Sequence, residues 1–105
     1  MNSWILLFIA GLFEVAWAVG LKFTHGFTKL LPSILTLVGT SLSFLFLSLA
    51  LKKIPLSIAY AVWTGIGIAG TSILGIWIFN EAVSISKIVF VSFILIGIVG
   101  LRLTN

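Results

Sequence analysis

The chain of 105 residues contains no cysteine, two prolines, one histidine and two acidic residues, and only 8% of its side chains are charged. The absence of cysteine excludes disulfides and thiolate chemistry. One histidine and two acids cannot build a metal site within one subunit, so we expect neither a metal nor another cofactor. Soluble domains carry about 25% charged residues. So low a charge content predicts an integral membrane protein.

The six basic residues outnumber the two acids and give the chain a net charge of +4. In a soluble protein this balance would suggest binding to nucleic acid. Here each basic residue lies near the end of an apolar run, where Lys and Arg side chains reach the lipid headgroups. We therefore expect membrane lipid around the chain and no nucleic-acid partner.

Four long apolar runs cover residues 4–21, 30–51, 56–79 and 84–103. Each run is long enough for one helical crossing of a bilayer, which takes about 20 residues. Four strands could not close a membrane barrel, and the runs do not alternate between apolar and polar residues. The expected fold class is therefore an all-α membrane protein, a small bundle of four transmembrane helices that forms one domain over residues 1–105.

Glu14 lies in the middle of the first apolar run, which contains no other ionisable group. A charged side chain at the centre of a bilayer costs at least about 2.5 kcal/mol on insertion scales. Such a residue normally faces a cavity, a partner or a transport pathway. Because the spans contain so few other polar groups, Glu14 is the first candidate for a functional residue.

Ala10, Glu14 and Trp17 recur at intervals of four and three residues, which places them on one face of the first helix. Gly11 flanks this face. Small residues on one side of the carboxylate and a large aromatic ring on the other predict the floor and wall of a pocket. The indole N–H of Trp17 could also donate to the carboxylate. The alternative is that Trp17 belongs to the aromatic belt at the membrane interface.

Tyr60, Trp63 and Gly67 share one face of the third helix, at intervals of three and four residues. Aromatic faces attract cations, and the attraction grows when the cation is desolvated. A buried carboxylate with aromatic neighbours therefore suits a weakly hydrated organic cation. Gly65 and Gly67 predict either a flexible point in this helix or close packing against a neighbour, and the sequence does not separate the two.

The second helix carries several hydroxyl side chains, among them Thr36, Thr40, Ser41, Ser43 and Ser48. Such hydroxyls commonly donate to the carbonyl four residues earlier, so the pattern alone does not distinguish Ser43. In the fourth helix, Gly97 and Gly100 lie among bulky aliphatic residues, which predicts helix contact. We interpret this helix as the dimerisation helix. Glu81 falls in a loop and is expected to be solvated or paired with Lys87.

The basic residues are divided equally between the two membrane sides that four spans would define. One side has Lys52, Lys53 and Arg102, and the other has Lys22, Lys29 and Lys87. Orientation is normally set by an asymmetry in Lys and Arg, and none is present. Either other features fix one orientation, or copies insert both ways and pair antiparallel. Such a dimer would also bring two Glu14 carboxylates to one site.

Three segments together resemble the small multidrug resistance transporters, and the similarity extends over essentially the whole chain. They are residues 11–18 (GLFEVAWA), 21–29 (LKFTHGFTK) and 55–67 (PLSIAYAVWTGIG). Within that family, a tryptophan three residues after the glutamate, here Trp17, is similar to the guanidinium-exporting branch. The quaternary-ammonium branch typically has glycine there. Departures from the family pattern lie mainly in aliphatic stretches such as residues 44–47 and 85–96.

The resemblance implies an antiparallel, dual-topology homodimer in the bacterial inner membrane that exchanges protons for a cationic substrate. Glu14 matches the carboxylate that binds both the proton and the substrate. Trp17 and Ser43 match residues that hold the glutamate pair in a hydrogen-bond network. Tyr60 and Trp63 match the aromatic residues of the substrate pocket.

The function expected from this resemblance is proton-coupled export of guanidinium, with small substituted guanidines or hydrophobic cations as further substrates. One alternative, from the same family, is export of quaternary ammonium and other lipophilic cations. A passive dual-topology channel is an alternative of another class, although a channel has little use for a central carboxylate that binds tightly. A third alternative is a subunit that does not transport, or that works only in a hetero-pair. We expect no enzyme and no catalytic residue, because the chain has no nucleophile–base set and no cofactor motif.

Overall fold

The computed structural model describes residues 2–104 and contains four helices. They are α1 (Ser3–Phe23), α2 (Leu30–Ala50), α3 (Leu56–Phe79) and α4 (Ile85–Thr104). The four apolar runs predicted from the sequence differ from these helices by at most two residues at any end. Each helix is long and apolar enough to cross a membrane. The all-α class and the four spans are therefore confirmed.

The helix ends follow local chemistry. The side chain of Asn2 accepts a hydrogen bond of 2.7 Å from the Trp4 amide and so caps the start of α1. Pro55 precedes α3, where its missing N–H leaves no hydrogen bond unmade. Asn80 ends α3 in the left-handed conformation, at a φ of 54°. These residues stop the helices near the edges of the apolar runs.

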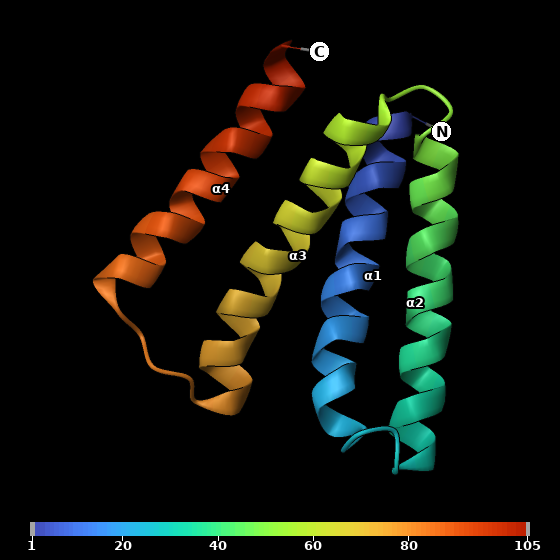
Figure 1. Cartoon of the computed structure of the whole chain (residues 1–105), viewed down its shortest axis with the longest axis vertical. Coiled ribbons are helices and arrows are strands. Elements are labelled where there is room, and N and C mark those ends of the chain that lie inside the picture. Colours follow the sequence, from blue (N-terminus) through green and yellow to red (C-terminus); the bar gives the residue numbers. More distant parts are fainter. Residues whose placement is uncertain (1, 105) are drawn as a thin grey trace.

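Helix α1 is the central helix of the subunit, with α2 on one side and α3 on the other (Figure 1). The buried core lies toward the membrane side where α1 and α3 begin and α2 ends. It consists of Leu7, Ala10, Leu47, Ala50, Ile54, Ala59, Val62 and Trp63. Three helices therefore share one core. Helix α1 contributes Leu7 and Ala10, which lie in the two turns before Glu14.

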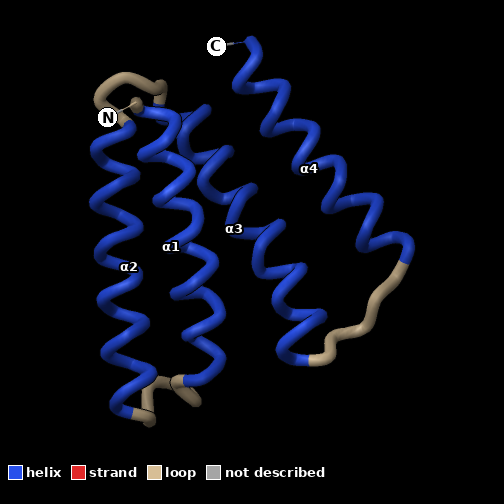
Figure 2. The backbone as a smooth tube through the Cα atoms, turned by 180° about the vertical axis from the view of Figure 1, so that it is seen from behind, coloured by secondary structure: helices blue, strands red, loops and turns tan. Residues whose placement is uncertain are grey.

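Helix α4 lies outside this three-helix bundle, beyond α3 (Figures 1 and 2). None of its described residues is buried. It packs against α3 through Ile94 and Ile98, whose side chains meet Gly65. Within the described part of the subunit, α4 therefore approaches only α3 closely and leaves its other faces open. The physical reason is that lipid tails are as apolar as the helix, so no hydrophobic force drives α4 into the bundle of its own subunit.

Candidate cation site around Glu14

The carboxylate of Glu14 lies against Gly67, where α1 and α3 approach each other. A Cβ atom added at Gly67 would collide with both the carboxyl carbon and the oxygens of Glu14. Oxygen Oε1 is buried and has no hydrogen-bond partner among the described residues. Glu14 itself is only partly buried. The absence of a side chain at Gly67 therefore makes room for an acid that the subunit leaves unpaired.

A hydrogen-bond network connects α1, α2 and α3 one turn away from the carboxylate. The hydroxyl of Ser43 donates to the carbonyl oxygen of Ala10 at 2.7 Å. The indole Nε1 of Trp63 donates in turn to the Ser43 hydroxyl at 3.0 Å. Ser43 is fully buried, and Trp63 is 5% exposed. Ser43 thus connects the turn that precedes Glu14 to the aromatic face of α3, and it does not contact Glu14 directly.

Tyr60 and Phe44 extend the aromatic surface on either side of Trp63. The Tyr60 ring meets the Trp63 ring edge-on, with 5.4 Å between their centroids. The Phe44 ring is tilted against Trp63 at 5.6 Å. Because Tyr60 and Phe44 are about half exposed, their outer faces are open. Trp63 is fixed by packing and hydrogen bonding, whereas Tyr60 and Phe44 are accessible to a ligand or a partner.

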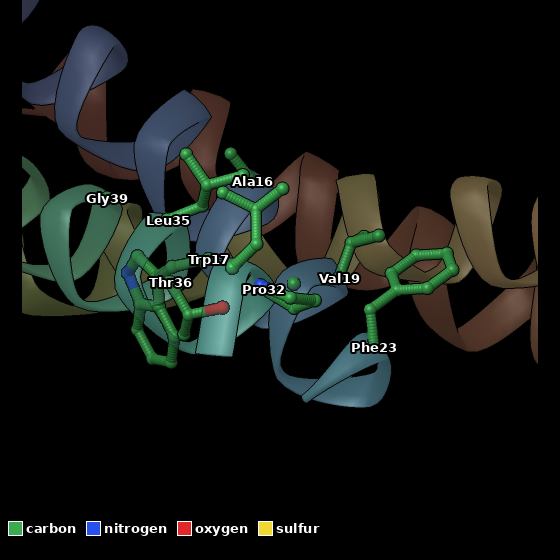
Figure 3. Close-up of a pocket in the computed structure, with 10 residues that line it drawn as sticks. Ala16, Trp17, Val19, Phe23, Pro32, Leu35, Thr36 and Gly39 are labelled. Carbon is green, nitrogen blue, oxygen red and sulfur yellow. The ribbon is translucent and has the colours of Figure 1, made fainter. Parts of the chain in front are cut away.

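Trp17 is directed toward α2 rather than toward the carboxylate. It lies in a groove of about 410 Å³ between α1 and α2, which Thr36 and Gly39 also line (Figure 3). Its Nε1 is buried without a hydrogen-bond partner among residues 2–104. The Trp17–Glu14 hydrogen bond considered from the sequence is therefore not formed within the subunit.

The other small residues chosen from the sequence fall into two groups. Gly11 and Gly65 face neighbouring helices, where an added Cβ would come within 2.7 Å of Ile66 and 2.5 Å of Ile98, respectively. Helix α3 runs unbroken through Gly65 and Gly67. In contrast, an added Cβ at Gly97 or Gly100 would meet no atom within 4 Å. The α3 glycines permit close packing inside the subunit, and the α4 glycines lie open.

Glu81 forms the second acidic site, at the end of the bundle where α1 and α3 end. Its carboxylate lies 3.4 Å from the Lys87 ammonium, which confirms the expected pairing. It also lies 3.9 Å from the ammonium of Lys22. The Lys22 contact had no signal in the sequence, because the two residues are far apart along the chain. Since these groups are partly exposed, the pairs contribute little to stability.

Two features of the site were not found by sequence reasoning. The bond from Trp63 to Ser43 and the contact of Phe44 with Trp63 both join α2 to α3. The spacing of residues within one helix shows which of them share a face, but not which other helix that face meets. The only signal for either contact was the aromatic character of α3.

Comparison with known proteins decides the family. The family model described as Small Multidrug Resistance protein matches residues 2–94. The chain belongs to the small multidrug resistance family. It is 52% identical over 103 residues to a protein named guanidinium exporter from Proteus vulgaris, a match that covers 98% of this chain and 99% of the relative. A guanidinium exporter from Yersinia pseudotuberculosis matches with the same identity and coverage, and one from Citrobacter freundii is 50% identical over 103 residues, with 98% of each chain covered.

Membership in this family confirms the resemblance noted in the sequence and agrees with the four apolar helices. The protein is a multi-pass transporter of the bacterial inner membrane. A family of transporters also supports the expectation that the chain is not an enzyme.

Proposed function

We propose that this protein exports guanidinium in exchange for protons, as an antiparallel, dual-topology homodimer in which each subunit contributes Glu14. Small substituted guanidines or hydrophobic cations are further candidate substrates. The observation that carries the proposal is the Glu14 carboxylate, which lies near the middle of a membrane span and has one buried oxygen without a partner in residues 2–104. A position of this kind calls for a proton or a cation.

Competition for one site is sufficient to couple the two ions. Two ionised carboxylates in a membrane are costly, so either protons or one cation must bind between them before the site changes the membrane side that it faces. If two protons and the cation bound together, the site would carry excess positive charge. On one side of the membrane, binding of the cation therefore requires the release of protons. On the other side, binding of protons requires the release of the cation. Coupling follows as long as the empty, charged dimer rarely changes its orientation.

Guanidinium fits such a site in shape as well as charge. It is planar, and its N–H donors can engage two carboxylates at once. The exposed ring of Tyr60, held against Trp63, would provide additional attraction for a cation. The relatives named guanidinium exporters, at 50–52% identity, support the same substrate for this chain. In the proposed dimer, Trp17 and Ser43 support the glutamate pair.

Three observations support the dimer. The basic residues are divided equally between the two membrane sides, so they favour neither orientation. Helix α4 has no buried residue of its own, and both of its glycines lie open. The motion would be a rocking of two subunits in unlike conformations about the shared site. We propose that Gly65 and Gly67 allow α3 to adjust its path during this motion.

The decisive experiment replaces the acid without changing its size. Purified Glu14→Gln protein in liposomes should take up no guanidinium under a proton gradient while remaining dimeric, because the site then has no exchangeable charge. Glu81→Gln is the matched control, since it removes the only other acid of the chain and should keep near-parental uptake. Near-parental uptake by Glu14→Gln would contradict the proposal.

Electrical recording from the same liposomes separates the alternatives. Guanidinium should evoke proton-coupled currents that a tetraalkylammonium ion does not match. Larger currents with tetraalkylammonium would identify an exporter of lipophilic cations, and a current without proton coupling would identify a channel. Transport by the purified chain alone would exclude an obligate hetero-pair.

A further inference from the structure

The two membrane sides of the subunit differ in how their charges are neutralised. At the end of α3, Glu81 lies within 4 Å of both Lys22 and Lys87. The opposite side, where α1 and α3 begin and α2 and α4 end, carries Lys52, Lys53 and Arg102. The two acids of the chain both lie elsewhere. No side-chain carboxylate of the subunit can therefore neutralise these three cations.

An apolar groove opens beside one of these cations. It has a volume of about 290 Å³ and lies between α1, α3 and α4, with Phe8, Ile66 and Ile98 among its walls. Arg102 and Trp4 both line it. The Arg102 guanidinium lies 4.8 Å from the centre of the Trp4 ring, where the ring attracts and positions it. The groove thus combines aliphatic walls with a cation near the membrane surface.

A second cavity adjoins the same tryptophan. It has a volume of about 340 Å³, and Asn2, Ser3, Trp4, Lys53 and Ile54 line it. Trp4 is therefore a common wall between an apolar groove and a polar cavity, and each of them holds one basic residue. Tryptophan commonly occupies this boundary between hydrocarbon and headgroups.

We propose that the groove and the cavity together bind an anionic phospholipid. One acyl chain lies in the groove between α1, α3 and α4, the phosphate pairs with Arg102, and the rest of the headgroup reaches the cavity beside Lys53. Guanidinium groups bind phosphate with two parallel hydrogen bonds, and basic pockets between membrane helices favour acidic headgroups. A free anion would leave the aliphatic groove unfilled. A neutral lipid would leave the cations without a counter-charge.

Native mass spectrometry of the purified, delipidated protein tests the site. Phosphatidylglycerol or phosphatidylcholine with identical acyl chains is added back, and the bound lipid is counted. The parental protein should retain phosphatidylglycerol preferentially, and Arg102→Gln should weaken its binding about fivefold while phosphatidylcholine binding stays unchanged. Lys29→Gln is the matched control. It removes one positive charge at the start of α2, on the opposite membrane side, and should change nothing.

A second variant tests the groove itself. Val99 lines the groove and is 57% exposed, so Val99→Trp should fill the space without disturbing the core and should lower the binding of both lipids. Equal losses in Arg102→Gln and Lys29→Gln would show a diffuse charge effect and overturn the site. A second outcome would also overturn the site: Arg102→Gln weakens the dimer and leaves the preference for phosphatidylglycerol unchanged. The occupant of the groove would then be a second copy of the chain.

Discussion

The glycines of α3 and those of α4 occupy opposite environments, although both sets lie in apolar membrane helices. An added Cβ at Gly65 or Gly67 would collide with a side chain of another helix of the same subunit. At Gly97 or Gly100 it would meet no atom within 4 Å. Small residues let membrane helices approach closely. At the α3 glycines, another helix of the same subunit makes this close approach. At the α4 glycines, no helix of the subunit does so.

The difference assigns separate roles to the two helices. Gly67 leaves room for the carboxylate of Glu14, and Gly65 receives Ile98 of α4. Helix α3 therefore lies between the charged site and α4, which meet it at Gly67 and Gly65, on opposite faces of the helix. A shift of α4 against α3 would change the space at Gly65 and, through the backbone of α3, the surroundings of Glu14. The α4 residues that meet α3 at Gly65 are Ile94 and Ile98, both apolar.

Among the glycine variants, Gly67→Ala should have the largest effect on transport. Its methyl group would occupy the space of the Glu14 carboxylate, which must then turn away. We expect guanidinium uptake to fall about tenfold or more, a change of about 1.4 kcal/mol. The thermal stability of the subunit should change little, because the end of the Glu14 side chain can move. Uptake from liposomes and thermal unfolding in detergent measure the two effects.

Gly97→Ala is the matched control for this experiment. It adds the same methyl group to a membrane helix but has no neighbour within 4 Å inside the subunit. Uptake by Gly97→Ala should stay near parental in liposomes at a protein density that keeps the dimer intact. If both alanine variants reduced uptake equally, the effect would come from helix flexibility rather than from space at the carboxylate.

Gly65→Ala should reduce the stability of the subunit. The new methyl group would lie 2.5 Å from Cδ1 of Ile98, and overpacking of this kind costs about 1–3 kcal/mol. Ile98→Val removes the crowded methyl group. The double variant should therefore be more stable than the sum of the two single changes predicts. Strict additivity in thermal unfolding would indicate that α4 does not pack at Gly65.

The positions of the helices could be predicted from the sequence because the bilayer imposes them directly. A span must be long and apolar, and the charged and turn-forming residues must fall between the spans. Residues such as Lys52 and Pro55 therefore mark the helix ends to within two residues. The same physics leaves the place of α4 undetermined. An aliphatic face is equally stable against lipid and against protein.

The sequence was sufficient to predict which residue types form the candidate site, but not which residues of different helices touch there. A lone acid in an apolar run identifies Glu14, and helical spacing places Gly67 on the aromatic face of α3. That Gly67 lies against Glu14 depends on how α1 and α3 cross. The Ser43 hydroxyl reaches a carbonyl 33 residues away rather than the one four residues back. Only the tertiary packing decides between these two acceptors.

Gly97→Leu should have the smallest effect on the stability of the subunit. It tests what the open glycine face of α4 contacts. Because no atom lies within 4 Å of an added Cβ, the unfolding free energy should stay within about 0.5 kcal/mol of parental. If α4 joins the subunits at Gly97, leucine will hold the helices apart and weaken the dimer about tenfold, and alanine will have a smaller effect. Energy transfer between labelled subunits, followed as lipid dilutes them, measures this association. An unchanged dimer with leucine would mean that the Gly97 face of α4 meets lipid and that the subunits join elsewhere.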